Sequence, residues 1–107
     1  MKRTLVVPLP RASAAVEKAA YAMSGLRSRV CFVRLSDLVK IQRSVFISNL
    51  EELRRVRKRP PIWVARVGRR LVILDGHHRT VLSIQAGRKR IRARLYEAPV
   101  MSEKAPR

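Results

Sequence analysis

The sequence predicts a small α+β domain (a small α/β fold) in which a β-hairpin leads into a short helix. Residues 62–67 and 70–74 are rich in aliphatic side chains, and Gly68-Arg69 between them has the composition of a tight turn. After an Asp-Gly break, a helix is predicted over about 78–86. Residues 90–96 alternate between arginine and aliphatic side chains, which is typical of a half-buried strand. The predicted core residues are Ile62, Val64, Ile73, Val81, Ile91 and Leu95.

The N-terminal quarter of the chain predicts an extended segment followed by a helix. Residues 1–11 are expected to be extended and loosely held, because Pro8 and Pro10 exclude a helix there. Residues 12–24 are rich in alanine and carry a narrow apolar stripe at helical spacing, and Gly25 ends the helix that they predict. The stripe leaves two alternatives open, packing on the domain or packing on a second subunit.

The middle of the chain predicts a strand and a second helix. The apolar run within 30–35 favours a buried strand, and Ser36-Asp37-Leu38 a turn or a short helical start. Ser48 and Glu51 have the spacing of a capping box, in which each side chain bonds the other residue's backbone N–H. They predict a helix that begins at Ser48 and runs to about Arg59.

These elements divide the chain into three parts. Residues 1–29 are predicted to form an N-terminal extension that contains the Ala-rich helix, and residues 30–97 form the domain itself. Residues 98–107 are short and carry two prolines, so a disordered tail is expected there. A chain of 107 residues has room for one hydrophobic core.

The charge of the chain predicts its partners. Lys and Arg number 25 against 7 Asp and Glu, which gives a formal net charge of +18. Such a surface attracts polyanions, of which nucleic acid is the commonest. No apolar run approaches the roughly 20 residues of a membrane-spanning helix, so no membrane partner is expected. Cys31 is the only cysteine, which excludes an internal disulfide and favours a reducing, cytoplasmic compartment.

The segment from Asp75 to Thr80 predicts a phosphate-binding site. Free backbone N–H groups at a helix N-terminus attract anions, and the helix dipole adds to this attraction. Gly76 lets the backbone turn sharply and lets a phosphate approach closely. His78, Arg79 and the hydroxyl of Thr80 supply further donors. The alternative is a plain turn with a solvated Arg79 and a half-buried histidine.

These residues also carry a resemblance to a known family. The run Pro61-Ile62-Trp63-Val64, the hairpin, and the run from Val72 to Arg79 resemble the ParB/sulfiredoxin superfamily. The match extends over roughly residues 30–97. It implies a mixed sheet with a β-hairpin and a short helix after Asp-Gly-His-His-Arg. The helix-turn-helix and dimerisation regions of full ParB proteins are absent from this sequence.

In that superfamily the matching segment lies under the phosphates of a nucleotide. ParB proteins carry Gly-Glu-Arg-Arg there and bind CTP, sulfiredoxins carry Gly-Cys-His-Arg and use ATP, and free serine kinases carry Asp-Gly-His-Thr-Arg. Gly76 and Arg79 match all three motifs, His78 matches the sulfiredoxin motif, and Asp75 and His77 match the kinase motif. The resemblance thus implies CTP or ATP, with Mg²⁺, as a ligand. The nucleotide- or phosphate-binding residues expected are Gln42, Arg43, Gly76, His77, His78, Arg79 and Thr80.

Departures from the family patterns leave the chemistry open. His77 replaces the sulfiredoxin cysteine, so sulfinic-acid repair is not expected. Gln42-Arg43 is similar to part of the upstream CTP-binding segment of ParB proteins but lacks the glutamate that follows. Whether the chain is an enzyme is undecided: a phosphotransferase or NTPase like the free serine kinases, or a nuclease-like activity, would use Asp75 or His77 as catalytic candidates. Adjacent histidines on a helix point about 100° apart, so no metal site is expected.

The basic residues gather in segments that predict a DNA-binding surface. With few aromatic residues expected on the surface, sequence-tolerant binding to duplex DNA is favoured over stacking on single strands. The function predicted is a nucleotide- or phosphate-binding domain that associates with DNA in the cytoplasm, on the nucleoid; a homodimer is an open alternative. The DNA-binding residues expected are Arg54, Arg55, Lys58, Arg59, Arg69, Arg70, Arg88, Lys89, Arg90, Arg92 and Arg94.

Overall fold

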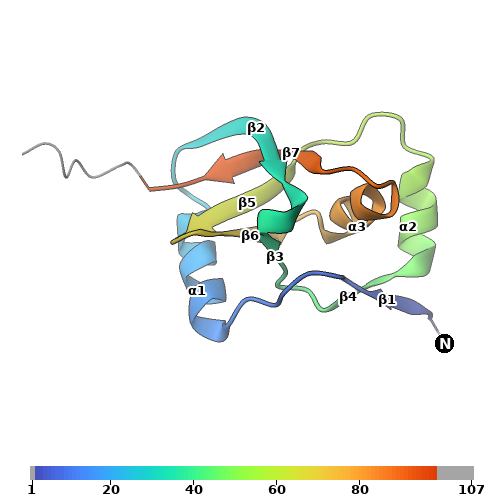
Figure 1. The fold of residues 1–107 in the computed structure, drawn as a ribbon, viewed down its shortest axis with the longest axis horizontal. Coiled ribbons are helices and arrows are strands. Elements are labelled where there is room, and N and C mark those ends of the chain that lie inside the picture. The colour runs from blue at the N-terminus through green and yellow to red at the C-terminus, as the bar shows by residue number, and fades with distance from the viewer. Residues whose placement is uncertain (1, 99–107) are drawn as a thin grey trace, which may run out of the picture.

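A five-stranded mixed sheet organises the computed structural model, which describes residues 2–98. Its strand order is β2-β7-β5-β6-β3, and β1 and β4 form a separate two-stranded sheet (Figure 1). The strands are β1 (Thr4–Val6), β2 (Ser28–Arg34), β3 (Leu38–Val39), β4 (Ser44–Phe46), β5 (Ile62–Val67), β6 (Arg70–Asp75) and β7 (Arg90–Tyr96). The helices are α1 (Ala14–Met23), α2 (Ile47–Arg54) and α3 (His77–Gln85), with a 3-10 turn, η1, at Leu35–Asp37. The predicted α+β class is confirmed.

The predicted hairpin is the β5–β6 pair. Its turn holds Gly68 at φ +62°, a left-handed conformation that glycine adopts without steric cost. Strand β7 pairs parallel with β5 and antiparallel with β2, so the chain must cross over between β6 and β7. Helix α3 forms this crossover, and its N-terminus therefore lies at the end of β6, directly after Asp75. This position makes the start of α3 the place where a ligand site is expected.

The core fills both sides of the sheet. Helix α3 and the segment around Leu9 pack on one face, while α1 packs on β5 and β6 from the other. Figure 1 shows α1 beneath β5 and β6, at the end of the molecule away from α3. The prediction of the core is confirmed, because all six predicted residues are at most 9% exposed. None of the helices within residues 2–98 has both the length and the apolar character needed to cross a membrane.

The N-terminal segment is part of the packed structure, so the prediction that it is loosely held is wrong for the described residues. Strand β1 pairs antiparallel with β4, and Val7 behind it is fully buried. The buried Lys40 holds this segment, since its Nζ donates to the carbonyl of Val7 at 2.6 Å. Helix α1 is capped by Ser13 and packs on the domain itself, which is one of the two alternatives that the sequence left open. It buries Ala20 against the sheet. Residues 2–29 thus contribute to the same core as the predicted domain.

Helix α2 differs from its prediction at both ends. It begins at Ile47, with Phe46 at the N-cap. The backbone N–H of Ile47 still donates to the carbonyl of Arg3, so the helix starts directly where the small sheet ends. Ser48 is therefore inside the helix, and no capping box forms. The helix ends at Arg54 instead of Arg59. Beyond Val56 the chain has only basic side chains before the prolines, so further turns would bury nothing and would bring like charges together.

Strand β2 is buried on one face only, which corrects the prediction of a buried strand. Val33 points into the core, whereas Val30 and Phe32 are exposed on the opposite face. The reason is the position of β2 at the edge of the sheet, beyond the part that α1 covers. The expected disordered tail lies outside the described residues, apart from Ala98.

Candidate phosphate-binding site

The start of α3 has the backbone geometry that the sequence predicts. Gly76 is the N-cap at φ +110°, and no side chain caps this end of the helix. The first intrahelical bond of this turn runs from Thr80 N to Gly76 O at 2.9 Å. The N–H groups of His77, His78 and Arg79 precede that bond and point out of the helix end. They form a set of donors that an anion can accept from.

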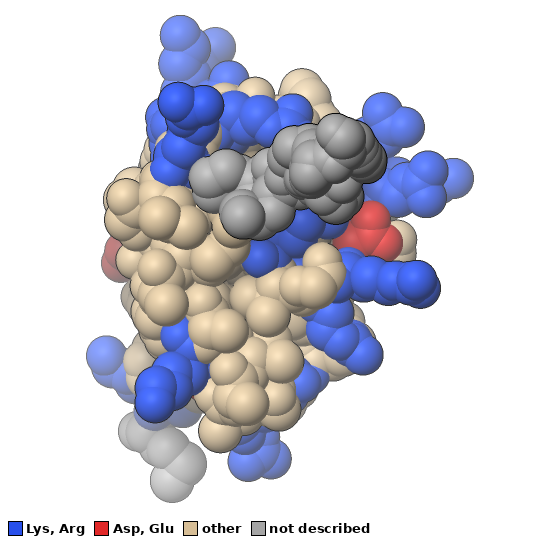
Figure 2. Space-filling view, turned by 90° about the vertical axis from the view of Figure 1, so that its left-hand side faces the viewer, with Lys and Arg blue, Asp and Glu red and all other residues tan. Residues whose placement is uncertain are grey.

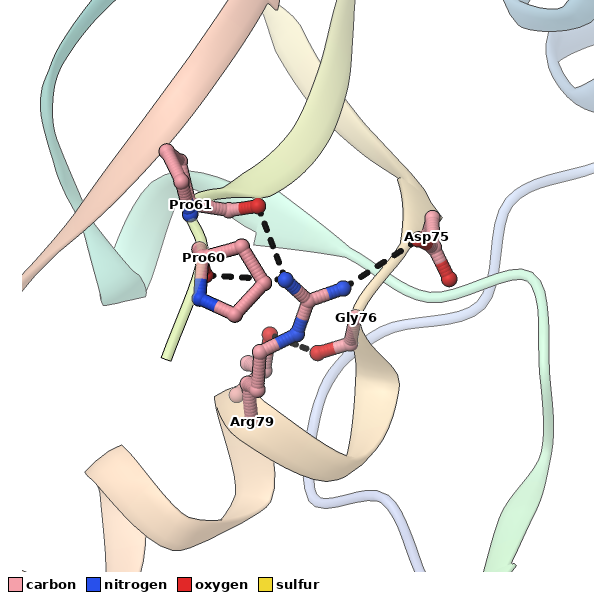
Figure 3. A network of polar contacts seen from close by, with 6 residues as sticks. Pro60, Pro61, Asp75, Gly76 and Arg79 are labelled. Atoms are coloured by element: carbon pink, nitrogen blue, oxygen red, sulfur yellow. Dashed lines mark hydrogen bonds and ion pairs between the residues drawn. The ribbon is translucent and has the colours of Figure 1, made fainter. Parts of the chain in front are cut away.

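Arg79 lies in a network of contacts within the fold (Figure 3). Its Nη1 donates to the carbonyls of Pro60 and Pro61 at 2.8 and 2.9 Å, and its Nη2 lies 3.2 Å from Oδ2 of Asp75. The side chain is only 14% exposed. Arg79 thus ties the loop before β5 to the start of α3, and the alternative of a solvated arginine is wrong. The Nε–H and one hydrogen of Nη2 are left for a ligand.

His77 is a structural residue in this arrangement. It is buried, and its Nε2 accepts hydrogen bonds from the backbone N–H groups of Ile41 and Gln42 at 3.0 and 3.1 Å. These bonds require an unprotonated Nε2. Burial, with a smaller contribution from the positive charge on His78, lowers the pKa of His77 from 6.5 to about 4. His77 therefore holds Gln42 beside the motif and has no Nε2 proton to offer a phosphate.

Thr80 does not reach the site, which corrects its assignment as a phosphate contact. The residue is fully buried, and its hydroxyl donates back to the carbonyl of Gly76 at 2.9 Å. This i−4 bond is a common use of a threonine within a helix. Arg43 is exposed and contributes its backbone carbonyl, which accepts from Val7, while its side chain is absent from the lining of the cavity at the start of α3.

A cavity of about 380 Å³ opens at the N-terminus of α3. It brings Gln42 together with the motif residues from Asp75 to Arg79, although more than 30 residues separate them in the sequence. Its other polar lining residues, Tyr21 of α1 and Asn49 of α2, were not predicted, because nothing local in the sequence links those helices to the motif. Nε2 of His78 is buried there without a hydrogen-bond partner, and burial lowers the pKa of this histidine.

A second depression, which we call the basic hollow, lies beside this cavity and has a volume of about 260 Å³. Among the described residues, no Asp or Glu lines it. Phe32, Pro60 and Ser83 contribute to its wall, and Arg79 lines both depressions. Three separate segments supply its arginines, which are Arg57, Arg59, Arg79, Arg88, Arg90 and Arg92.

The structure divides the predicted DNA-binding residues into groups. Arg59, Arg88, Arg90 and Arg92 meet in the basic hollow, and Lys89 lines another depression, which shares Arg88 and Arg90 with it. The side chains of two others are engaged elsewhere: Arg54 donates to Gln85 at 2.6 Å, and Arg94 donates to Ser28 at 3.2 Å. Arg55 and Lys58 are exposed around the C-terminal end of α2.

Arg69 and Arg70 belong to the opposite end of the molecule, at the β5–β6 turn. Figure 2 faces this end and shows Lys and Arg around its rim, with little Asp or Glu. The predicted DNA-binding residues therefore do not form one patch. The largest gathering of arginines is the basic hollow.

The catalytic candidates are placed differently. Asp75 lines the cavity with its carboxylate largely exposed and ion-paired to Arg79. His77 also lines the cavity, but it is buried and its Nε2 accepts from the backbone N–H groups of Ile41 and Gln42. In the part of the chain that the structure describes, Asp75 is the only carboxylate that lines the cavity. Within residues 2–98, no three His, Cys, Asp or Glu side chains are grouped closely enough to hold a metal ion.

Acidification is expected to destabilise the protein through His77. With a pKa of about 4 in the folded chain against 6.5 when unfolded, this residue is neutral in both states above pH 6.5. Below that pH the unfolded chain gains the proton first, so stability is lost as the pH falls from 6.5 towards 4, by at most about 3 kcal/mol. Urea denaturation at pH 7 and pH 4.5 measures the loss.

The matched control for this prediction is the neighbouring histidine. His77→Asn should lower stability at pH 7 and should remove this part of the pH dependence, while His78→Asn should keep it. An unchanged pH dependence in His77→Asn would assign the effect to other groups.

Comparison with known proteins identifies the fold. No protein-family model matches the sequence, and no curated protein matches it. The crystal structure of sulfiredoxin from Arabidopsis thaliana has a TM-score of 0.56 at 21% identity, over 65% of this chain and 86% of that one. A Pnob8-like ParB-N domain has a TM-score of 0.51 at 18% identity, over 78% and 34%. A free serine kinase in complex with AMP has a TM-score of 0.53 at 18% identity, over 90% and 36%.

The chain spans most of the sulfiredoxin but only about a third of each of the other two proteins. At these identities the similarity is one of fold. The three structures are those of the protein classes that the Asp-Gly-His-His-Arg run resembles. The mixed sheet, the hairpin and the helix after Gly76 agree with that resemblance. The chain therefore has the ParB/sulfiredoxin-like fold.

Proposed function

We propose that the chain binds the phosphate groups of a nucleotide in the cavity at the N-terminus of α3 and associates with DNA through the basic hollow. The observation that carries the nucleotide proposal is the meeting of Gln42 with Gly76, His78 and Arg79 in one cavity. Three outward backbone N–H groups and the remaining donors of Arg79 suit a phosphate, and the dipole of α3 favours a negative charge there. One of the similar structures is a free serine kinase in complex with AMP, which supports a nucleotide as ligand.

The DNA part of the proposal rests on the arginines of the hollow. Arg79 is paired with Asp75, but the other five guanidinium groups in this depression repel one another, and polyanion binding relieves this repulsion. Arginine bonds phosphate in a two-pronged manner, which suits backbone contacts. Contacts of this kind position a duplex without reading its sequence. We therefore propose sequence-tolerant association with duplex DNA.

Asp75 gives a test of nucleotide binding with a defined sign. Its carboxylate lies in the cavity, so it repels a phosphate, and Asp75→Asn should tighten the binding of CTP or ATP with Mg²⁺ by about 5-fold. The asparagine can still accept the bond from Arg79. Asp37→Asn is the matched control, because it removes the same charge from η1, whose residues do not line the cavity. Calorimetry measures both; equal affinities in the two variants would place the phosphate elsewhere.

Arg79→Ala should weaken nucleotide binding by about 1.5–3 kcal/mol, as expected for a hydrogen bond to a charged group. The same change removes the contacts to Pro60 and Pro61, so thermal unfolding must first show that the variant is folded at the temperature of the measurement. If the folded variant binds every nucleotide as the wild type does, the site is not at α3.

A phosphotransferase or NTPase is the second candidate function. The observation that favours it is the presence of Asp75 in the same cavity, where a carboxylate could accept a proton from an attacking hydroxyl or water. Asp75→Asn then separates the two functions. A binding domain gains affinity in this variant, whereas an enzyme loses turnover of ATP or CTP. Release of inorganic phosphate from the wild type and the variant distinguishes them.

A further inference from the structure

We propose that the open face of β2, β7 and β5 binds single-stranded nucleic acid by stacking bases on Phe32 and Trp63. This face is separate from the nucleotide cavity and adjoins the basic hollow, where duplex binding is proposed. It also reverses the expectation that the chain has too few exposed aromatic residues for such a surface. Phe32 is 66% exposed and Trp63 is 43% exposed.

The register of the sheet places these side chains on one face. Phe32 of β2 is opposite Arg92 of β7, and Trp63 of β5 is opposite Arg94 of the same strand. Residues 92 and 94 are separated by one intervening residue, so all four side chains share a face of the sheet, with the two pairs about 6.6 Å apart along β7. Val30, opposite Arg94 on β2, extends the exposed apolar surface.

Within residues 2–98, the fold leaves this half of the sheet uncovered. Helix α1 packs on β5 and β6, and the residues beneath it, including Ala65 and Tyr96, are buried. Trp63 lies at the border of the covered area. Its ring meets that of Tyr96 edge to face, with centroids 5.8 Å apart, so the buried tyrosine fixes the indole in place. A fixed aromatic ring on an open sheet provides a stacking surface with little entropy to lose.

The charge of the face selects a nucleic acid strand over a second copy of the chain. Arg34, Arg90 and Arg92 are exposed around Phe32, and no Asp or Glu occurs in β2 or β7. A symmetric dimer through this face would bring the arginine-rich faces of two copies together, whereas a phosphodiester strand supplies one negative charge for each base. Single-stranded nucleic acid combines planar bases with that charge, which is the combination this face offers.

The face is continuous with the basic hollow. Phe32 and Arg92 line the hollow as well as facing the open sheet. When the bases of a nucleic acid strand stack on Phe32 and Trp63, the phosphates that follow can therefore reach Arg57, Arg88 and Arg90 in the hollow. The path joins an aromatic surface to an arginine cluster without crossing a carboxylate of β2 or β7.

The fluorescence of Trp63 reports directly on this proposal, because it is the only tryptophan of the chain. Titration with an oligothymidylate or an oligouridylate of about 12 nucleotides should quench it, and the two oligomers separate DNA from RNA. A duplex and an oligoglutamate of matched charge should quench it far less, since neither offers unpaired bases. Equal quenching by oligoglutamate would show that the face binds any polyanion and would overturn the proposal.

The decisive variant is Phe32→Ala, with Phe46→Ala as its matched control. Phe46 is 40% exposed on β4, and its ring meets Lys2 instead of the open face. Phe32→Ala should weaken single-strand binding roughly 5- to 100-fold, as expected for the loss of one stacked base. It should weaken duplex binding much less, because Phe32 lines the basic hollow but carries none of the charge that binds phosphates there. Phe46→Ala should change neither. Equal effects of the two variants, or an equal loss for duplex and single strand, would contradict stacking.

Calorimetry with CTP and ATP keeps this result separate from the function proposed for α3. Phe32→Ala should bind nucleotides as the wild type does, since Phe32 does not line the α3 cavity. If neither the wild type nor Phe32→Ala binds a nucleotide, the α3 site is refuted, and the proposal for the open face is unaffected.

Discussion

Gly76→Ala is expected to destabilise the protein by about 2–5 kcal/mol, because two independent costs add together. The backbone has φ +110°, which side chains other than glycine rarely adopt. An added Cβ would also lie 2.5 Å from Cγ2 and 2.8 Å from Cβ of Ile62, which is almost completely buried. Because Ile62 belongs to the central core, it cannot move away without disturbing the packing.

Gly68→Ala separates these two costs. Gly68 also has a positive φ, +62°, but no atom lies within 4 Å of the added Cβ. It should cost only the backbone strain, about 1–2 kcal/mol. Urea denaturation followed by circular dichroism compares the two variants. Equal losses would mean that Ile62 yields to the new methyl group and that the contact carries no cost.

The fold was predictable where its signals are local. The hairpin depends on Gly68 and its flanking strands, and the alternation of residues 90–96 depends only on neighbouring positions. Strand β1 was predicted only as an extended segment, because its partner, β4, lies about 40 residues away. The end of α2 was misplaced because the basic run after Val56 is compatible with a helix by intrinsic propensity, and only the lack of anything to bury ends it.

The candidate site was predictable as a segment, but the placement of its individual side chains was not. His77 and His78 are equivalent in the sequence, yet only the fold directs His77 towards the N–H groups of Ile41 and Gln42. The ion pair between Asp75 and Arg79 has the familiar i,i+4 spacing, although Asp75 ends a strand, and this spacing was a signal that sequence analysis missed.

Arg57 was missed for a related reason. A helix to Arg59 would have separated it from the arginines that were predicted to face DNA. In the structure α2 ends before it, and the side chain joins the basic hollow. The early end of one helix thus determines which basic residues lie together.

Replacing Arg88, Arg90 and Arg92 together with Ala should weaken duplex DNA binding strongly and for all sequences alike. Each arginine that neutralises a phosphate contributes about 0.9 to the slope of log affinity against log salt. If all three contact phosphates from the basic hollow, the slope should flatten by about two to three units. Arg94 is left in place because it is half-buried and bonded to Ser28. Fluorescence anisotropy with labelled duplexes at several salt concentrations measures the slope.

The matched control removes the same three charges from the other end of the sheet, in Arg27→Ala/Arg69→Ala/Arg70→Ala. These three side chains are exposed at the β5–β6 turn and the start of β2, away from the hollow. If binding depended on net charge alone, both triple variants would change the slope equally, and the hollow would not be the contact. Arg79→Ala should leave the slope nearly unchanged, because its guanidinium already bonds Pro60, Pro61 and Asp75. A slope controlled by Arg79 instead would assign the DNA contact to the α3 cavity.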